Sequence, residues 1–443
     1  MSCPSCLSSP TNWSRKSGRS WGGLGLKCNT TIRFLRDIAD IQTGPFGSQL
    51  HKEDYVEYGT PIVTVEHLGN RKFTEQNLPK VSDSDKERLK KYVLATGDIV
   101  FSRVGSVDRC SYVDEEHNGW MFSGRCLRVR PSENIDSLYL YYYFCREETR
   151  QFVRNIAVGA TMPSINTKLL GEVPVAVPDL QIQKMVSNIL STIDNKIELN
   201  NKINANLQQQ AQAIFKSWFV DFEPFQDGEF VESELGTIPV EFTITRTGGL
   251  PLIVTDYVAN GSFASLKANV HLYQERNYAY FIRNTDLKSG EFKVFVDEHS
   301  YNFLSKSRLQ GGEIIISNVG DVGSVFLCPV LDAPMTLGNN MIMLKPECQE
   351  LQYYLYIWFK YSLGQNLIQG IKSGSAQPKF NKTDFKSLPI VLPPDKILQE
   401  FHEVVSPIFK LVEKNQLENR KIAMLRDVLL PKLMNGEIDI IKD

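Results

Sequence analysis

One stretch, residues 179–222, constrains the fold of this chain more than any other. It contains no glycine or proline, and its apolar residues recur at steps of three and four, as expected of one long amphipathic helix. A helix of roughly 40 residues is about 60 Å long, too long to bury its apolar stripe inside one ordinary domain. The chain must therefore supply a partner helix. The stripe consists of Ile189, Ile193, Ile197, Leu207, Ala211, Ile214 and Trp218.

Residues 397–433 supply that partner, because they repeat the pattern 215 positions later. Their apolar stripe consists of Val404, Ile408, Val412, Ile422, Leu429 and Leu433. Pro407 lies inside this second pattern, and it predicts a kink in the helix or a break between two segments.

Two asparagines interrupt each apolar stripe. Asn200 and Asn204 lie in the first helix, and Asn415 and Asn419 lie 215 positions later in the second. In coiled coils such residues lower stability and fix the register. We predict that the helices pack antiparallel, with Asn200 facing Asn419 and Asn204 facing Asn415.

The repeat extends beyond the helices, which indicates a tandem duplication. LATGDIVFSRVGSV at 94–107 and LQGGEIIISNVGDV at 309–322 share seven of fourteen positions, where about one is expected from average composition. VGATMPSIN at 158–166 aligns at the same offset with SGSAQPKFN at 373–381.

Each half combines short β-rich segments, separated by Gly, Asn and Asp turns, with helical patterns, so we expect an α+β fold. The stretch between the halves is acidic and is expected to be an exposed connector. The predicted boundaries are an extension that is disordered or misassigned at 1–30, a first domain at 31–178, a long helix at 179–223, the connector at 224–242, a second domain at 243–393, a second long helix at 394–436 and a tail at 437–443.

Composition excludes some classes of protein. No run of 18 apolar residues is present, so no membrane span is predicted. The net charge of −2 means that DNA binding would rest on local basic patches or on a partner. The eight cysteines are too sparse for a disulfide framework, which favours a reducing cytoplasm. Cys3, Cys6 and Cys28 leave a zinc site as an alternative, although no fourth ligand follows at a standard spacing.

Several segments carry a resemblance to a known family. FKSWFVDFEPFQDGEFVESELGTIP at 215–239, DIADIQTGPFGSQL at 37–50, YFIRNTDL at 280–287 and LLPKLMNGEIDI at 429–440 are similar to the specificity subunits of type I restriction-modification systems. The resemblance implies two target recognition domains separated by two long antiparallel coiled-coil helices. Each domain would bind one half of a split site in double-stranded DNA.

The same resemblance implies partners and excludes catalysis in this chain. The helix pair would set the spacer and dock two copies of an adenine methyltransferase subunit, and a nuclease and translocase subunit can join. No cofactor is implied. The sequence has no phosphate-binding loop of the G-x-x-x-x-G-K-[ST] type and no methyltransferase Asn/Asp-Pro-Pro-Phe/Tyr tetrapeptide. Glu291 and Lys293 have the spacing of a nuclease metal site, but no convincing partner carboxylate precedes them. A scaffold protein that does not bind DNA and a single-chain restriction enzyme are the rival functions.

Polar loops that recur in both halves are the best candidates for DNA contact, because loops on a rigid scaffold carry recognition. The alternative is that their glycines form turns and their polar residues cap helices. The candidates are Gln49, Arg103, Ser106, Arg109, Thr161 and Asn166 in the first half, Lys267, Arg283, Asn284, Asn318, Lys372, Ser375, Gln377 and Lys379 in the second, and a weaker cluster of His67, Arg71 and Lys72.

Aromatic residues at the end of the first long helix are the candidates for partner binding. The helix pair is expected to present exposed apolar side chains, including some of Trp218, Phe219, Phe222 and Phe225, and the resemblance implies that a methyltransferase subunit docks on each side. The aromatic runs at 139–144 and 353–359 are instead expected to pack in the domain cores, and the charge run at 86–91 is expected to be a solvated helix face.

Overall fold

The computed structural model describes residues 30–45, 49–374 and 376–438. The predicted extension and its three cysteines therefore lie outside the described residues, apart from Thr30. The chain divides into two compact units: unit 1 comprises residues 1–198 and 420–443, and unit 2 comprises residues 199–419. Among the helices of the described residues, none combines the length and hydropathy that a membrane span requires.

The described residues of unit 1 form two four-stranded sheets and one strand pair. We call the first sheet, of order β2-β9-β6-β7, the β6 sheet, and the second, of order β3-β5-β4-β8, the β4 sheet. The β6 sheet is antiparallel, whereas β4 and β8 pair in parallel. The strands are β1 Thr31–Phe34, β2 Ala39–Thr43, β3 Tyr55–Val56, β4 Thr60–Val63, β5 Lys80–Val81, β6 Ile99–Ser102, β7 Cys110–Tyr112, β8 Met121–Phe122, β9 Cys126–Pro131 and β10 Pro174–Val177, where β10 pairs with β1.

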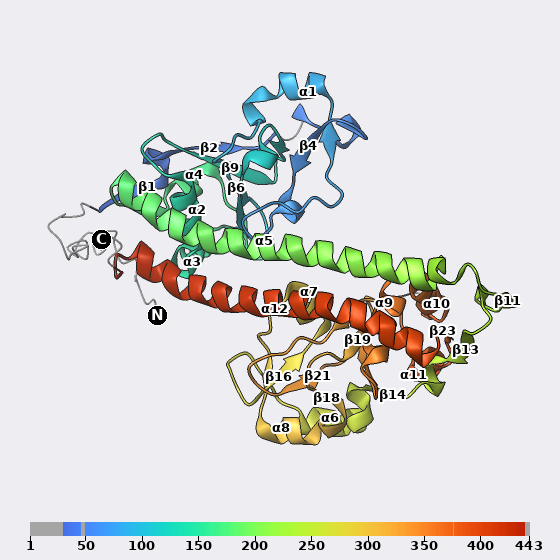
Figure 1. Cartoon of the computed structure of the whole chain (residues 1–443). Helices are drawn as coiled ribbons and strands as arrows, with labels where there is room; N and C mark the ends of the chain where they lie inside the picture. The colour runs from blue at the N-terminus through green and yellow to red at the C-terminus, as the bar shows by residue number, and fades with distance from the viewer. Residues whose placement is uncertain (1–29, 46–48, 375, 439–443) are drawn as a thin grey trace. The chain divides into compact units, whose positions relative to one another are not determined.

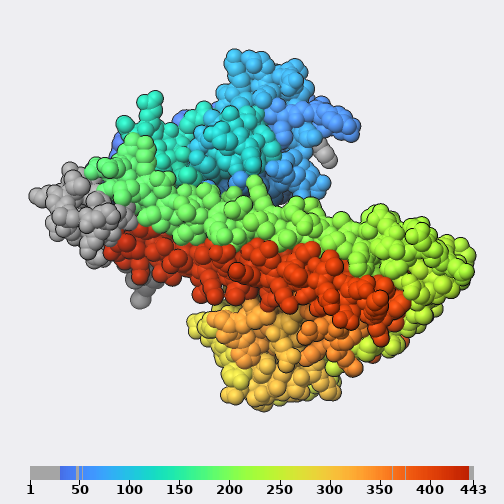
Figure 2. Space-filling model, in the orientation of Figure 1, coloured from blue at the N-terminus to red at the C-terminus, as the bar shows by residue number. Residues whose placement is uncertain are grey.

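The core of unit 1 joins the β6 sheet to the long helices. Tyr139 and Tyr142, from the predicted aromatic run, are buried with Ile182 and Val186 of the first long helix, as the prediction required. Figure 2 shows the cyan surface of this domain directly on the green surface of that helix. The short helices are α1 Asp83–Arg88, α2 Ser137–Cys145, α3 Glu147–Ile156 and α4 Thr167–Gly171.

Unit 2 has the corresponding strands in the corresponding order, with β18 as an additional edge strand. Its β19 sheet has the order β14-β22-β19-β20, and its β16 sheet has the order β15-β17-β16-β21-β18, with β16 parallel to β21. The strands are β13 Thr243–Arg246, β14 Leu252–Asp256, β15 Leu272–Tyr273, β16 Ala279–Ile282, β17 Phe295–Val296, β18 Arg308–Leu309, β19 Ile314–Ser317, β20 Val325–Leu327, β21 Met335–Leu337, β22 Met341–Pro346 and β23 Pro389–Leu392. The short helices are α6 Phe263–Asn269, α7 Asn284–Ser289, α8 Glu298–Phe303, α9 Glu350–Lys360, α10 Ser362–Gly370 and α11 Lys382–Lys386.

The register repeats as well as the strand order. Ile99 pairs with Tyr112 and with Val129 in unit 1, and Ile314 pairs with Leu327 and with Leu344 in unit 2. Each residue of the second set lies 215 positions after its counterpart. The sequence repeat is therefore also a repeat of the backbone hydrogen-bonding pattern.

The connector is not a simple exposed link. It forms a hairpin of β11 Phe230–Ser233 and β12 Gly236–Pro239, and it buries Ile238 and Phe242 in the core of unit 2. Most of its other residues are exposed, as predicted.

The connector covers part of the predicted aromatic docking surface. Phe219 and Phe222 are buried, and Trp218 and Phe225 are half-buried against the same core. The ring of Phe242, which the connector supplies, lies 5.7 Å from that of Phe222 and 5.1 Å from that of Phe225. Phe219 and Phe222 are therefore packed by their own chain, whereas Trp218 and Phe225 stay partly exposed.

Two helices of 40 residues each, α5 Leu180–Phe219 and α12 Asp395–Met434, correspond to the two predicted long helices; they are the long green and red helices of Figure 1. The predicted break at Pro407 is absent, because α12 continues through it. The ring nitrogen of Pro407 cannot donate to the carbonyl of Glu403. Both residues are exposed, so water can hydrate that carbonyl and the helix tolerates the missing bond.

Within unit 2 the four asparagines pair as predicted. Asn200 donates to Asn419 at 2.8 Å, and Asn415 donates to Asn204 at 2.9 Å. Asn200 also donates to Glu418 at 2.9 Å. As the residue number rises from 200 to 204 in α5, that of the partner in α12 falls from 419 to 415. These two segments therefore run antiparallel.

Candidate nucleic-acid interface

Two of the predicted loops and one further turn leave the β6 sheet of unit 1 from the same end. Thr43, Ser102 and Cys126 are neighbours there, because Thr43 pairs with Leu127 and Ser102 pairs with Cys126. The loop at 44–49, the loop at 103–109 and the turn at 123–125 all begin or end at these residues. Of the first loop, residues 46–48 lie outside the described part.

A fourth segment, 158–166, is bonded to the second of these loops. The amide of Gly105 donates to the carbonyl of Pro163 at 2.8 Å, and the amide of Ile165 donates to the carbonyl of Arg103 at 2.9 Å. Gly159 has a φ of +106°, and a Cβ there would lie 2.6 Å from the carbonyl oxygen of Met162. The glycine is therefore required by the turn, and the two loops form one cross-linked frame.

Unit 2 contains the same frame. The amide of Gly320 donates to the carbonyl of Pro378 at 2.8 Å, and the amide of Phe380 donates to the carbonyl of Asn318 at 3.1 Å. Gly374 takes the place of Gly159, with a φ of +85°. We call these paired segments, 103–109 with 158–166 and 318–324 with 373–381, the loop frames of units 1 and 2.

The loop frame of unit 1 presents Ser106, Arg109 and Thr161 as exposed side chains. Arg103 lies at its base and donates to the carbonyl of Gly124 at 3.1 Å. Sequence reasoning missed Arg125, an exposed residue of the adjoining turn whose carbonyl accepts from the amide of Arg103 at 2.8 Å. The sequence signal that could have identified Arg125 is the pair Gly124-Arg125 between the strands β8 and β9.

The loop frame of unit 2 presents a different set of groups. Asp321 accepts from Lys288 at 2.6 Å, from Ser324 at 2.6 Å and from Asn284 at 3.2 Å. The hydrogen bonds from Lys288 and Ser324 lower the pKa of Asp321 to about 2. Asn318 donates to the carbonyl of Phe380 at 3.3 Å, while its own carbonyl oxygen is buried without a hydrogen-bond partner in the described structure.

Basic and amide side chains continue this frame. Lys372, Gln377 and Lys379 are exposed, and Lys372 also donates to Gln369 at 3.2 Å. Ser375 lies outside the described residues. Lys267 is exposed on α6, a helix that packs on α8, and no described contact links it to the loop frame.

Some predicted DNA-contact residues have structural roles instead. His67 is buried, and its ring accepts from the amide of Thr64 at 3.0 Å. Asn166 caps α4 by accepting from Leu169 at 2.9 Å. Gln49 accepts from the hydroxyl of Tyr92 at 2.6 Å. These side chains satisfy their own backbone or core, as the alternative interpretation required.

Three further candidates are held by carboxylates. Arg283 is bound to Asp286 at 2.6 Å within the first turn of α7. Arg71 and Lys72 both reach Glu198 of the long helix α5, at 3.3 Å and 3.4 Å. In the predicted weaker cluster, His67 is therefore buried, and Arg71 and Lys72 are bound to a carboxylate of the same unit.

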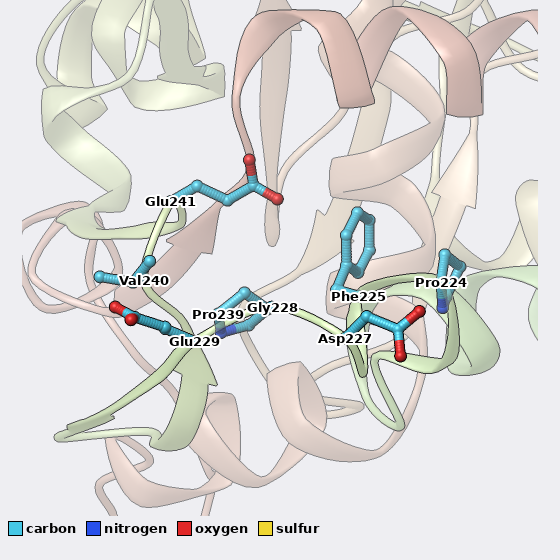
Figure 3. Close-up of a pocket in the computed structure, with 8 residues that line it drawn as sticks. All are labelled: Pro224, Phe225, Asp227, Gly228, Glu229, Pro239, Val240 and Glu241. Atoms are coloured by element: carbon cyan, nitrogen blue, oxygen red, sulfur yellow. The ribbon is translucent and has the colours of Figure 1, made fainter.

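One pocket of unit 2 is unsuited to nucleic acid. A pocket of about 450 Å³ lies in the connector, and its wall includes the carboxylates of Asp227, Glu229 and Glu241 beside the ring of Phe225, as Figure 3 shows. Its charge would repel phosphate groups. In the described chain no three His, Cys, Asp or Glu residues are grouped so as to hold a metal ion, and Lys293 forms an exposed ion pair with Glu291 at 2.6 Å.

Comparisons with known proteins identify the kind of chain to which these features belong. A family model for the type I restriction modification DNA specificity domain matches residues 29–209 and 220–426. The MjaIX specificity subunit from Methanocaldococcus jannaschii is 26% identical over 417 residues, which cover 92% of this chain and 93% of the relative. The HindI specificity subunit from Haemophilus influenzae is 25% identical over 429 residues, which cover 83% of this chain and 92% of the relative.

The fold is also found among solved structures. The S subunit of the type I restriction-modification system from M. genitalium superimposes with a TM-score of 0.55 at 16% identity, covering 94% of this chain and 98% of that one.

Proposed function

Because this chain belongs to the family of type I restriction-modification DNA specificity proteins, we propose that each of its two units binds one half of a bipartite DNA site. The observation that carries this proposal is the pair of loop frames. Each has the same backbone hydrogen bonds and different exposed side chains. A duplicated scaffold with divergent loops is what two readers of unlike half-sites require.

The chemistry of the frames fits base recognition. Arg109 and Arg125 in unit 1 are exposed guanidinium groups beside a rigid turn, and an arginine of this kind can donate two hydrogen bonds to the edge of a guanine. Unit 2 offers the amide of Gln377, which can pair with adenine, and the ammonium group of Lys379. Family membership and these groups together favour DNA recognition over the rival function of a scaffold.

The helix pair completes the proposal. The asparagine pairs in unit 2 are suited to fixing one register of α5 on α12, and this register would set the spacer between the half-sites. Two copies of an adenine methyltransferase subunit would dock on the helices and supply the chemistry, a nuclease and translocase subunit could join, and the complex would act in the cytoplasm. We propose a tandem duplication as the origin of the two halves.

The surface for docking must lie elsewhere than on the buried aromatic residues. In unit 1, Met424, Leu425 and Val428 of α12 are 65%, 50% and 55% exposed and lie within two turns of the helix. Apolar side chains grouped in this way are typical of a protein interface. We place one docking surface for the methyltransferase there.

The test is methylation of defined DNA duplexes by this chain in complex with its methyltransferase subunit. The change R109A should reduce discrimination at one half-site, and K379A should reduce it at the other, each by about tenfold, the loss of one good base contact. K90A removes an exposed lysine of the same charge outside both frames and should leave discrimination unchanged. Equal effects of R109A and K379A at both half-sites would contradict the assignment of one unit to each.

A further inference from the structure

Arg71 and Lys72 make a contact within unit 1 that the sequence did not indicate. Arg71 and Lys72 lie in the loop that follows β4, between its 3-10 turn Val65–His67 and β5. Arg71 donates to Asn195 at 2.8 Å and to Glu198 at 3.3 Å, while Lys72 lies 3.4 Å from the second oxygen of Glu198. One carboxylate of the long helix α5 therefore holds both cations.

Hydrogen bonds other than those to the helix hold the backbone of this loop. Arg71 has a φ of +68°, a left-handed conformation that is unfavourable for a residue with a Cβ. Its carbonyl accepts from the amide of Tyr112 at 2.7 Å, and the hydroxyl of Ser111 donates to the carbonyl of Gly69 at 3.0 Å. Such a conformation persists only where its surroundings impose it, and it is often associated with function.

Lys72 connects the same contact to the core beneath the β4 sheet. It lies 2.8 Å from Asp114, which accepts from the amide and the ring of the buried His117. That ring packs edge-on against Phe73 and Trp120, at 5.2 Å and 4.6 Å. Burial alone would lower the pKa of Lys72, but Asp114 and Glu198 outweigh it and raise this pKa above its ordinary value. Lys72 is therefore charged at neutral pH.

A second contact lies one helical turn earlier on the same face of α5. Asp194 is buried, and it accepts from the hydroxyl of Tyr142 at 2.6 Å and from Arg426 of α12 at 2.8 Å. Tyr142 belongs to the β6 sheet side of the domain, whereas Arg71 and Lys72 belong to the β4 sheet side. Contacts at positions 194 and 198 together hold both parts of the domain against the helix, because residues i and i+4 share one face.

Among its described residues, unit 2 shows no ion pair equivalent to this contact. The positions 215 residues later are Phe409 and Glu413. Phe409 stacks on Tyr353 with ring centroids 4.5 Å apart, while Glu413 is exposed and forms no ion pair with any residue that the structure describes. The charged contact is a feature of unit 1, and Glu413 offers a matched control.

We propose that Glu198, through Arg71 and Lys72, is a positioning residue that holds the β4 sheet of the first recognition domain in one orientation on α5 and thereby determines which spacer the protein accepts. The inference rests on the proposed function. In this proposal Glu198 contacts no base. It affects specificity by fixing the orientation of the first recognition domain on α5.

The experiment uses the full chain in complex with its methyltransferase subunit. The bipartite motif is first mapped from methylated adenines, and methylation rates are then measured on duplexes with the mapped spacer and with spacers one base pair shorter and longer. Glu198→Lys sets a third positive charge against Arg71 and Lys72. It should reduce the preference for the mapped spacer by about tenfold, equivalent to 1.4 kcal/mol. Glu413→Lys should leave the preference unchanged.

Glu198→Gln provides a second variant if the reversal prevents folding. It retains an oxygen that accepts from Arg71 but removes the charge opposite Lys72, so the preference should fall by about threefold, less than in the reversal. A double-mutant cycle with Lys72→Met should show non-additive effects on the spacer preference.

Three results would overturn the proposal: an unchanged preference in folded Glu198 variants, an equal loss in Glu413→Lys, or a uniform fall of all rates with the preference intact. Thermal unfolding of each complex identifies the folded variants. Failure of the proposed function itself would be distinguishable, because the wild-type complex would then produce no bipartite motif.

Discussion

The pair formed by Asn204 and Asn415 in unit 2 leads to a prediction in which a single substitution and a double substitution have opposite signs. The two side chains are 6% and 8% exposed, and one hydrogen bond of 2.9 Å joins them. Asn204→Leu adds about 2 kcal/mol of apolar burial, but it removes a hydrogen bond of about 1 kcal/mol and leaves the Asn415 amide unpaired at about 2 kcal/mol. The single variant should therefore be less stable by about 1 kcal/mol.

Replacing both asparagines by leucine removes the unpaired group. Two buried leucines contribute about 4 kcal/mol, and the one lost hydrogen bond costs about 1 kcal/mol, so the double variant should be more stable than the wild type by about 3 kcal/mol. Asn206→Leu, at an exposed position of the same helix, should change stability by less than about 0.5 kcal/mol.

Urea unfolding followed by tryptophan fluorescence measures these differences, since Trp218 and Trp358 both lie in the core of unit 2. Additive effects of the two single substitutions would refute the account, because they would mean that the amides do not depend on each other. The functional counterpart is that replacing all four asparagines by Leu or Ile leaves the chain folded but loosens spacer choice. A preserved spacer preference would remove the register role.

Three other predictions concern separate parts of the molecule. Phe219→Ala should destabilise unit 2 by about 3–5 kcal/mol because it empties a site lined by Tyr354 and Phe401, whereas exposed Val220→Ala should cost less than about 1 kcal/mol in the same urea titration. Met424→Ser with Leu425→Ser should weaken the complex with the methyltransferase subunit at least about tenfold by sedimentation or calorimetry and leave the fold intact; unchanged affinity would move the docking surface. Lys288 and Ser324 lower the pKa of Asp321 to about 2. The contribution of Asp321 to stability is therefore present above the pKa that this carboxyl has in the unfolded chain, and it is lost as pH falls from about 4 toward 2. Asp321→Asn should abolish that part of the acid dependence of stability, and an identical acid profile would contradict the ion pair.

The 215-residue offset explains why much of the architecture was predictable. Local patterns located α5, α12 and the aromatic cores, and the repeated asparagines gave the pairs that the structure contains. Gly159 and Gly374 of the loop frames lie in a Gly-x-x-x-Pro pattern, a local signal typical of a turn with a positive φ.

Long-range contacts explain where prediction from sequence failed. Arg71 lies 124 positions before Asn195, to which it donates, so no local pattern indicated that its charge was already satisfied. Phe219 and Phe222 were candidates for exposure because no local pattern indicated that the connector packs against them. Phe242, a connector residue that follows the hairpin, lies against both rings.

Unit-specific side chains on a common frame were predictable only in part. Ser106 and Asp321 occupy equivalent positions, yet only the structure shows that Lys288 and Asn284 surround the carboxylate. Base preference depends on such neighbouring side chains, and here they come from a separate element, the helix α7. The sequence therefore located the loops without giving their chemistry.

The most direct measurement of the central claim is a map of methylated adenines in the host genome, with the gene for this chain intact and deleted. The account predicts one class of methylated site that disappears on deletion. Each such site should consist of two specified half-sites separated by a fixed gap of unspecified bases, on the order of one to one and a half turns of DNA between half-site centres. A continuous motif with no gap, or an unchanged set of methylated adenines after deletion, would contradict the claim that the two units bind two halves of one site.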